Sequence, residues 1–119
     1  INVIYGINDD SALGGQQAYE EAGLDMDKLL TLGFGVEGKA GKDALIAGGP
    51  YKAGLGMFPE YVGRALIDQA EKVIAGEEVP ERTVTPMTVI TPDNLNDFYT
   101  EEDGEWIINF DNVSKLLEE

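Results

Sequence analysis

The chain has 119 residues, the size of a single domain that can bury a substantial apolar core. Its 23 acidic and eight basic residues give a formal net charge of −15, so nucleic acid and anionic lipid are disfavoured as partners of this segment. The absence of cysteine and histidine excludes disulfides and sulfur metal sites and removes the commonest general base and metal ligand. We therefore expect no cofactor, no resident metal and no enzymatic activity.

No stretch approaches the ~18 consecutive apolar residues that span a bilayer, so a membrane-spanning helix is not expected. The chain begins at Ile1, without a methionine and already inside a predicted strand. We interpret it as a piece of a longer protein.

The first predicted strand, residues 1–7, is a nearly continuous apolar run, which is typical of a parallel strand buried on both faces. A polar cluster of Asn8, Asp9 and Asp10 follows it directly. We expect Asp9 or Asp10 to cap the next helix by accepting a hydrogen bond from its first amides. Ligands of open α/β sheets bind beyond the carboxyl ends of strands, which is where Asn8 falls.

Strand and helix patterns then alternate along the chain. Strands are predicted at 1–7, 29–34, 51–57 and 83–90, and helices at 10–22, 38–47 and 59–75. This alternation implies βαβ units with right-handed crossovers. We predict an α/β fold with three layers, α/β/α, around a mainly parallel, doubly wound sheet. Gly14 and Gly15 predict close packing of their helix on a strand, and Pro86 restricts the last strand to a sheet edge or a crossover.

The helix at 59–75 has the clearest pattern. Pro59 suits its first position and Gly76 its end. Residues at three- and four-residue spacing predict its buried face, namely Phe58, Val62, Ala65, Leu66, Gln69, Val73 and Ile74. Three lysines, Lys39, Lys42 and Lys52, are interpreted as solvated surface. Beyond residue 90 a short helix with Leu95 and Phe98 on its buried side leads to an apolar tail.

The run from Asn8 to Gly14 resembles the Asn-Asp-x-x-Ala-x-Gly signature of the type I periplasmic sugar-binding proteins, which LacI-type repressors share in their effector domain. The order that follows is also similar. A strand ends in Gly33-Phe34-Gly35, a second ends near Met57-Phe58-Pro59, and a long helix ends near Gly76. The resemblance covers roughly residues 1–90.

The resemblance implies two α/β lobes joined by hinge strands, with ligand bound between them. Residues 1–82 correspond to strand–helix units of an incomplete C-terminal lobe, and 83–119 to a hinge-crossing strand and the tail. Trp106 in that tail would pack on the other lobe. Two earlier strands would lie beside residues 1–7 in the family, so this strand should present a free sheet edge that pairs with a second chain or with the rest of its own protein.

Carried over by position, the resemblance makes Asn8 a contact to sugar hydroxyls; the alternative is that Asn8 only satisfies the following turn. Asp9 is a further candidate ligand contact. The family's Asp after Gly-Phe falls on Gly35, and a third polar contact falls near Met57, whose other interpretation is a core residue. Two polar contacts are therefore missing, and Glu37 could restore a carboxylate by reaching back.

The function that follows is the extracytoplasmic solute-binding component of an ABC importer, found in the periplasm or outside the cell. Its partners would be a small sugar-like ligand, the N-terminal lobe and a membrane permease. The alternative is the effector-sensing domain of a LacI-type repressor. Repressors of this type usually end soon after the hinge, whereas this chain continues through residues 88–99 in the manner of the binding proteins. An enzyme on a similar scaffold is a third, weaker candidate.

Overall fold

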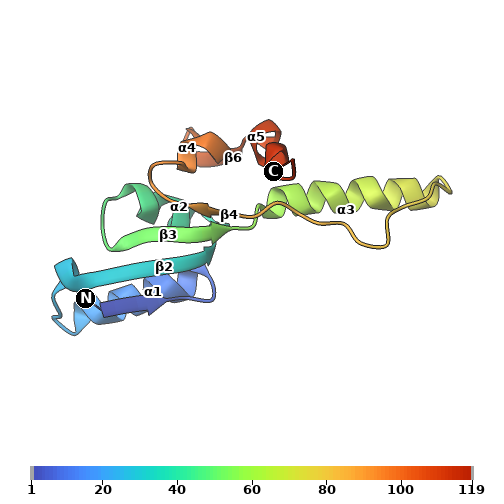
Figure 1. The fold of residues 1–119 in the computed structure, drawn as a ribbon. Coiled ribbons are helices and arrows are strands. Elements are labelled where there is room, and N and C mark those ends of the chain that lie inside the picture. The colour runs from blue at the N-terminus through green and yellow to red at the C-terminus, as the bar shows by residue number, and fades with distance from the viewer. Residues whose placement is uncertain (1, 119) are drawn as a thin grey trace.

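The computed structural model describes residues 2–118 (Figure 1). The elements occur in the order β1 (Asn2–Tyr5), α1 (Asp9–Glu21), a short 3-10 helix (Met26–Lys28), β2 (Leu29–Gly35), α2 (Lys39–Ile46), β3 (Tyr51–Gly56), α3 (Pro59–Ile74), β4 (Thr88–Ile90), α4 (Leu95–Phe98), β5 (Tyr99–Glu102), β6 (Glu105–Ile108) and α5 (Phe110–Lys115). No helix in this described range is long and apolar enough to cross a membrane.

The main sheet has the strand order β1-β2-β3-β4. The first three strands are parallel, and β4 runs antiparallel to β3. The prediction of an α/β fold with a mainly parallel sheet is confirmed. Within residues 2–118, β1 pairs only with β2 and so leaves one edge of the sheet free, as predicted. The fourth strand is shorter than the predicted 83–90, because only Thr88–Ile90 joins the sheet, at its other edge and just beyond Pro86.

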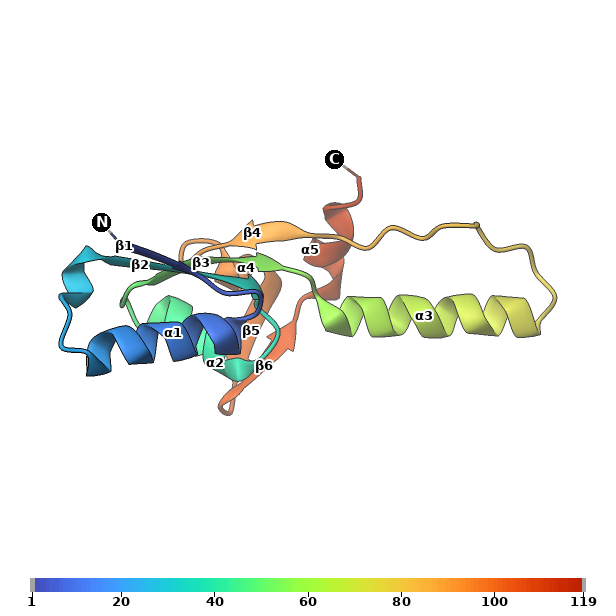
Figure 2. The same ribbon diagram turned by 90° about the horizontal axis from the view of Figure 1, so that it is seen from below.

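Helices α1 and α2 pack on the same face of the sheet (Figure 2). Gly15 allows the close approach of α1 to β1, because a Cβ there would lie 3.0 Å from Ile4 Cγ2, as predicted. The same expectation is wrong for Gly14, which has no heavy atom of a neighbouring element within 4 Å of its Cβ position. The opposite face of the sheet carries no helix in the described chain. We call this side the open sheet face.

The predicted third layer is not on the sheet. Helix α3 starts at the carboxyl end of β3 and continues away from the sheet, and none of its residues is buried (Figures 1 and 2). The molecule consequently measures 60 × 28 × 27 Å. The predicted burial of the first strand on both faces is also wrong, since Val3 is 57% and Tyr5 64% exposed. In the part of the chain that the structure describes, no helix covers β1 on its open-face side, and no strand pairs with its outer edge.

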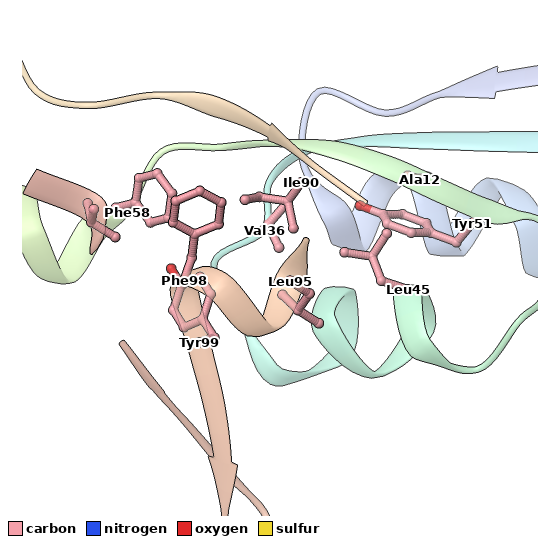
Figure 3. Packing of buried hydrophobic residues seen from close by; sticks show 10 residues of the cluster. Ala12, Val36, Leu45, Tyr51, Phe58, Ile90, Leu95, Phe98 and Tyr99 are labelled. Carbon is pink, nitrogen blue, oxygen red and sulfur yellow. The ribbon is translucent and has the colours of Figure 1, made fainter. Parts of the chain in front are cut away.

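The C-terminal tail closes the core on the same side as α1 and α2 (Figure 3). Phe58 packs against Phe98 and Tyr99, with ring centroids 5.5 and 6.0 Å apart. Leu95 and Phe98 are buried, as predicted from the short helix. Trp106 contacts α2 of this chain, and its packing on another lobe stays a prediction. Its indole Nε1 donates a 2.9 Å hydrogen bond to Asp43 of α2.

The ends of the helices agree with the sequence-based predictions, except for the residue that caps α1. Gly23, Gly48 and Gly76 adopt positive φ after α1, α2 and α3, as expected of helix stops. The cap of α1 is Asn8, whose Oδ1 accepts a 2.8 Å hydrogen bond from the Ser11 amide. The predicted cap, Asp9 or Asp10, is wrong because the helix begins one residue earlier, with Asp9 already in its first turn.

Candidate ligand site at the carboxyl ends of β1 and β2

A cavity of about 330 Å³ lies where β1 and β2 end and helices α1 and α2 begin. Its lining comprises Asn8, Asp9, Asp10, Glu37, Gly38, Ala40 and Gly41. The structure therefore brings together three of the five predicted site residues, Asn8, Asp9 and Glu37. Gly35 and Met57 are not among the lining residues. This is the edge at which open α/β sheets bind ligands.

Asn8 has the capping role that was one of its two interpretations, and its role as a ligand contact stays a prediction. Its Oδ1 caps α1 through the Ser11 amide. An asparagine amide also carries an Nδ2 group with two donor hydrogens, and that group remains able to serve a ligand. Asn8 is solvent-exposed and lines the cavity, so a ligand can reach it.

Asp9 is a support for the site. It is 6% exposed, and both carboxylate oxygens accept hydrogen bonds within the chain. Oδ1 accepts a 2.5 Å bond from the Tyr51 hydroxyl of β3, and Oδ2 accepts a 3.1 Å bond from the Glu37 amide. Asp9 thus ties the start of α1 to β3 and to the loop after β2.

Two glycines make room for the Asp9 carboxylate. A Cβ on Gly33 would lie 2.6 Å from Asp9 Oδ1, and one on Gly41 would lie 2.7 Å from Oδ2. A larger residue at Gly41 would displace the carboxylate, and one at Gly33 would displace both the carboxylate and the Tyr51 hydroxyl, which is the nearer of the two. Burial and the hydrogen bond to Asp9 raise the pKa of Tyr51 well above its ordinary value. The Tyr51 hydroxyl therefore remains a donor to Asp9 at neutral pH.

Glu37 folds back over Gly35. A Cβ built on Gly35 would lie 2.6 Å from Glu37 Oε1 and 3.0 Å from its Cδ. The Glu37 carboxyl group thus fills the space that a side chain at position 35 would need. The sequence resemblance places an aspartate at position 35, and this chain instead positions a carboxylate there from two residues further along.

The backbone after β2 enforces this return. Gly35 has φ 113° and Val36 has φ 49°, a region that β-branched residues rarely adopt. Val36 is fully buried, and Gly54 leaves the space for it, because a Cβ on Gly54 would lie 2.6 Å from Val36 Cγ2. The packing of Val36 fixes a strained turn at the rim of the cavity, and strain of this kind is concentrated at functional sites.

Met57 lies one strand further along the same edge. Its amide donates a 3.1 Å hydrogen bond to the Gly35 carbonyl, so the two predicted positions are neighbours in the backbone. Met57 itself is half-buried and lies outside the lining of the cavity. The next residue, Phe58, is fully buried in the core.

Lys42 was interpreted as solvated surface, and this is wrong. It is 1% exposed, and its Nζ donates hydrogen bonds of 2.6 Å to the Glu37 carbonyl and 3.4 Å to the Gly38 carbonyl. Nζ also lies 4.1 Å from the centroid of the Tyr99 ring. Burial lowers the pKa of Lys42, and the charges of Glu60, Asp9 and Glu37 oppose that shift. Through its two hydrogen bonds to backbone carbonyls, Lys42 holds the Glu37 loop in place.

Tyr99 also supports the Glu37 loop, through its contact with Lys42. Nothing in the sequence predicted this role. The Tyr99 hydroxyl donates a 3.3 Å hydrogen bond to Glu60 Oε2. Burial, with the charge of Glu60 next in size, raises the pKa of Tyr99. Lys42 and Tyr99 are 57 residues apart in the chain, and no local periodicity reports such a contact.

The fold, together with a cavity at the carboxyl ends of its parallel strands, defines the class of protein. The structure has the α/β fold of the periplasmic solute-binding proteins of ABC transporters, so the resemblance recognised in the sequence is confirmed. One similar structure is an ABC transporter periplasmic solute-binding protein from Actinobacillus succinogenes with bound D-allose. It is 26% identical, has a TM-score of 0.72, and the match covers 82% of this chain and 34% of that one.

Two further similar proteins are also named as binding proteins of small molecules. A myo-inositol-binding protein from Caulobacter, solved with myo-inositol, is 31% identical with a TM-score of 0.66, over 81% of this chain and 32% of that one. A protein of Rhizobium meliloti named as a rhizopine-binding protein is 33% identical over 93 residues, 76% of this chain and 29% of that one. This chain thus spans about a third of the length of these relatives. No protein-family model matches it.

Proposed function

We propose that the chain is part of the C-terminal lobe of an extracytoplasmic solute-binding protein that delivers a sugar or a similar polyhydroxylated ligand to an ABC importer. The observation that carries this proposal is the joint placement of Asn8 and Glu37 at one cavity, with the Glu37 carboxylate over Gly35. The relatives with bound D-allose and myo-inositol support the class of ligand.

The two side chains have complementary roles. Asn8 would donate from Nδ2 to a ligand hydroxyl oxygen, while Glu37 would accept hydrogen bonds from one or two hydroxyls. Asp9, Lys42 and Tyr99 would hold these groups in place without touching the ligand. A site that hydrogen-bonds hydroxyls rejects analogues that lack them by a factor of ~10⁴ or more.

The whole protein would close two lobes around its ligand and break no bond. Residues 1–82 would belong to one lobe, and 83–119 would include a strand that crosses to the other. Binding drives closure only when the ligand contacts both lobes and so has a higher affinity for the closed state. The closed form would then be recognised by a membrane permease on the outer side of the membrane. The similar structure with bound D-allose is an ABC transporter solute-binding protein, which favours this function over the LacI-type repressor.

The test is calorimetric titration of the intact protein that carries this chain with D-allose, myo-inositol and a nucleoside. Asn8→Ser retains a capping oxygen but removes the amide donor, and Glu37→Gln removes the charge. Each should weaken polyol binding at least tenfold, whereas the matched variants Asn96→Ser and Glu102→Gln, at exposed positions away from the cavity, should not. Unchanged affinity in both site variants would refute the assigned site, and failure of every polyol to bind would refute the ligand class.

A further inference from the structure

A series of side-chain contacts links the loop that carries Glu37 to the first turn of α3. Three residues make these contacts, namely Lys42 of α2, Tyr99 of β5 and Glu60 of α3, and we call them the junction cluster. The cluster lies where β3 ends and α3 begins. Tyr99 stacks there on Phe58, the residue directly before α3, with ring centroids 6.0 Å apart (Figure 3).

Lys42 connects the junction cluster to the ligand site. Its Nζ donates to the carbonyls of Glu37 and Gly38, so its hydrogen bonds go to the backbone of the loop. The amide of Glu37 donates at 3.1 Å to Asp9 Oδ2. The backbone of Glu37 is therefore held both at its carbonyl and at its amide. A loop that is held in this way presents its side chain to a ligand in a defined position.

Tyr99 lies between the other two members of the junction cluster. Lys42 Nζ is 4.1 Å from the centroid of the Tyr99 ring, which is a cation–π contact. Both residues are buried, and such a contact is stronger where water is excluded. On the other side, the Tyr99 hydroxyl donates its hydrogen bond to Glu60 Oε2. One side chain thus contacts both the lysine of α2 and the glutamate of α3.

Glu60 supplies a negative charge that stabilises the buried Lys42. A buried ammonium group is costly unless a charge of opposite sign lies nearby. Burial lowers the pKa of Lys42, and the charge of Glu60 is the largest of those that oppose this shift, ahead of Asp9 and Glu37. Glu60 lies in the first turn of α3. The strongest charge acting on Lys42 therefore comes from the helix and not from the loop.

The neighbours of Glu60 attach the first turn of α3 to the core. Phe58 is fully buried, and its carbonyl accepts the first bonds of the helix, from the amides of Tyr61 and Val62 at 2.9 and 3.1 Å. Tyr61 also packs against the core. Beyond this turn the helix continues away from the sheet (Figure 2). A change in the direction of α3 would therefore change the distance between Glu60 and Tyr99.

We propose that Glu60 is a positioning residue for the ligand site and acts, through Tyr99 and Lys42, on the loop that carries Glu37. The inference rests on the proposed function, in which Glu37 accepts hydrogen bonds from the ligand. Coupling of this kind is reciprocal. If the observed position of the first turn of α3 favours ligand binding, a bound ligand favours that position of α3 by the same factor.

The first measurement is amide hydrogen exchange in the intact protein that carries this chain, without ligand. Glu60→Gln keeps an oxygen that can accept from Tyr99 but removes the charge. The amide of Glu37 should then exchange at least about tenfold faster, because the loop opens more often. The amide of Thr31, which donates to the Pro50 carbonyl, is the internal reference and should keep its rate. A loss of global stability would accelerate that amide as well.

Two further variants show whether the effect depends on the junction cluster. Glu71→Gln removes the same charge from an exposed position on α3 and is the matched control, so the exchange rate at Glu37 should not change. Tyr99→Phe keeps the ring beside Lys42 but removes the hydrogen bond to Glu60, and it should accelerate the Glu37 amide. An unchanged rate in Glu60→Gln or in Tyr99→Phe, or an equal acceleration in Glu71→Gln, would overturn the proposal.

The second measurement is calorimetric titration of the same intact proteins with myo-inositol and with D-allose. Glu60→Gln should weaken binding about threefold or more in the parent, and clearly less in a Glu37→Gln background, which lacks the carboxylate that Glu60 positions. Equal effects in the two backgrounds would show that Glu60 does not act through Glu37. If neither polyol binds the parent protein, the ligand class of the proposed function fails, and the exchange rate of the Glu37 amide still decides whether Glu60 positions the loop.

Discussion

The carboxylate of Glu37 and a side chain on residue 35 would compete for the same space. Glu37 Oε1 lies 2.6 Å from the Cβ position of Gly35, whose φ of 113° is itself unsuited to an L side chain. The glycine and the glutamate therefore function as a pair. A carboxylate is supplied at the strand end by residue 37 only because residue 35 has no side chain.

Gly35→Ala should destabilise the chain. The methyl group would meet both the Glu37 side chain and an unfavourable φ, so we expect the free energy of unfolding to fall by about 1–3 kcal/mol in urea titrations. Gly14→Ala is the control, because its Cβ would meet open space within a helix. It should raise the free energy of unfolding by about 0.5–1 kcal/mol. Equal effects of the two variants would contradict the proposed pairing of positions 35 and 37.

Tyr51→Phe should also destabilise the chain. It removes the hydroxyl that donates to the buried Asp9 Oδ1 and leaves that carboxylate with one hydrogen bond fewer. Leaving a buried acceptor unsatisfied costs about 1–3 kcal/mol. Tyr19→Phe is the comparison, since the Tyr19 hydroxyl accepts its hydrogen bond from Asn2 at an exposed position. Its effect in the same urea titrations should be within about 0.5 kcal/mol.

Much of this architecture could be predicted from sequence, because hydrophobic periodicity and the helix stop signals are local. Local patterns were enough to predict the strands at 29–34 and 51–57 and the polar residues that follow β1 and β2. What the sequence could not reveal is which surface each amphipathic element meets. The apolar stripe of α3 predicts a sheet beneath the helix, whereas the structure has α3 pointing away from the sheet with none of its residues buried. The burial of Lys42 likewise depends on Tyr99, far along the chain.

High pH should reduce stability through Tyr51 and Tyr99. Burial raises the pKa of both residues, so the folded state keeps phenolic protons that the unfolded chain releases near pH 10. Their stabilising contribution is complete below pH ~10 and is lost as the pH rises towards their folded-state pKa values. Lys42 has the opposite effect on stability. Its pKa is lowered on folding, so its contribution to the free energy of unfolding increases as the pH rises.

The measurement is the free energy of unfolding in urea between pH 8 and 11. It should decline above pH ~10 in the parent chain. In a double variant, Tyr51→Phe with Tyr99→Phe, the free energy of unfolding should decline less over this pH range, or should increase. Only the contribution of Lys42, which increases with pH, then remains of the three. An identical pH dependence in both proteins would show that these tyrosines do not stay protonated in the folded state.

Trp106→Phe should raise the pKa of Asp43. The indole hydrogen bond of 2.9 Å is the largest cause that lowers this pKa, and the hydrogen bond from Lys39 is the next. Phenylalanine keeps the ring on α2 but cannot donate, so the Asp43 carboxylate loses its main stabilising partner. The check is an NMR titration of the Asp43 carboxyl carbon. Lys39→Met is the comparison; it removes both the hydrogen bond and the charge of Lys39, so it should also raise the pKa of Asp43. An unchanged pKa in Trp106→Phe would mean that β6 does not dock on α2 in solution as it does in the structure.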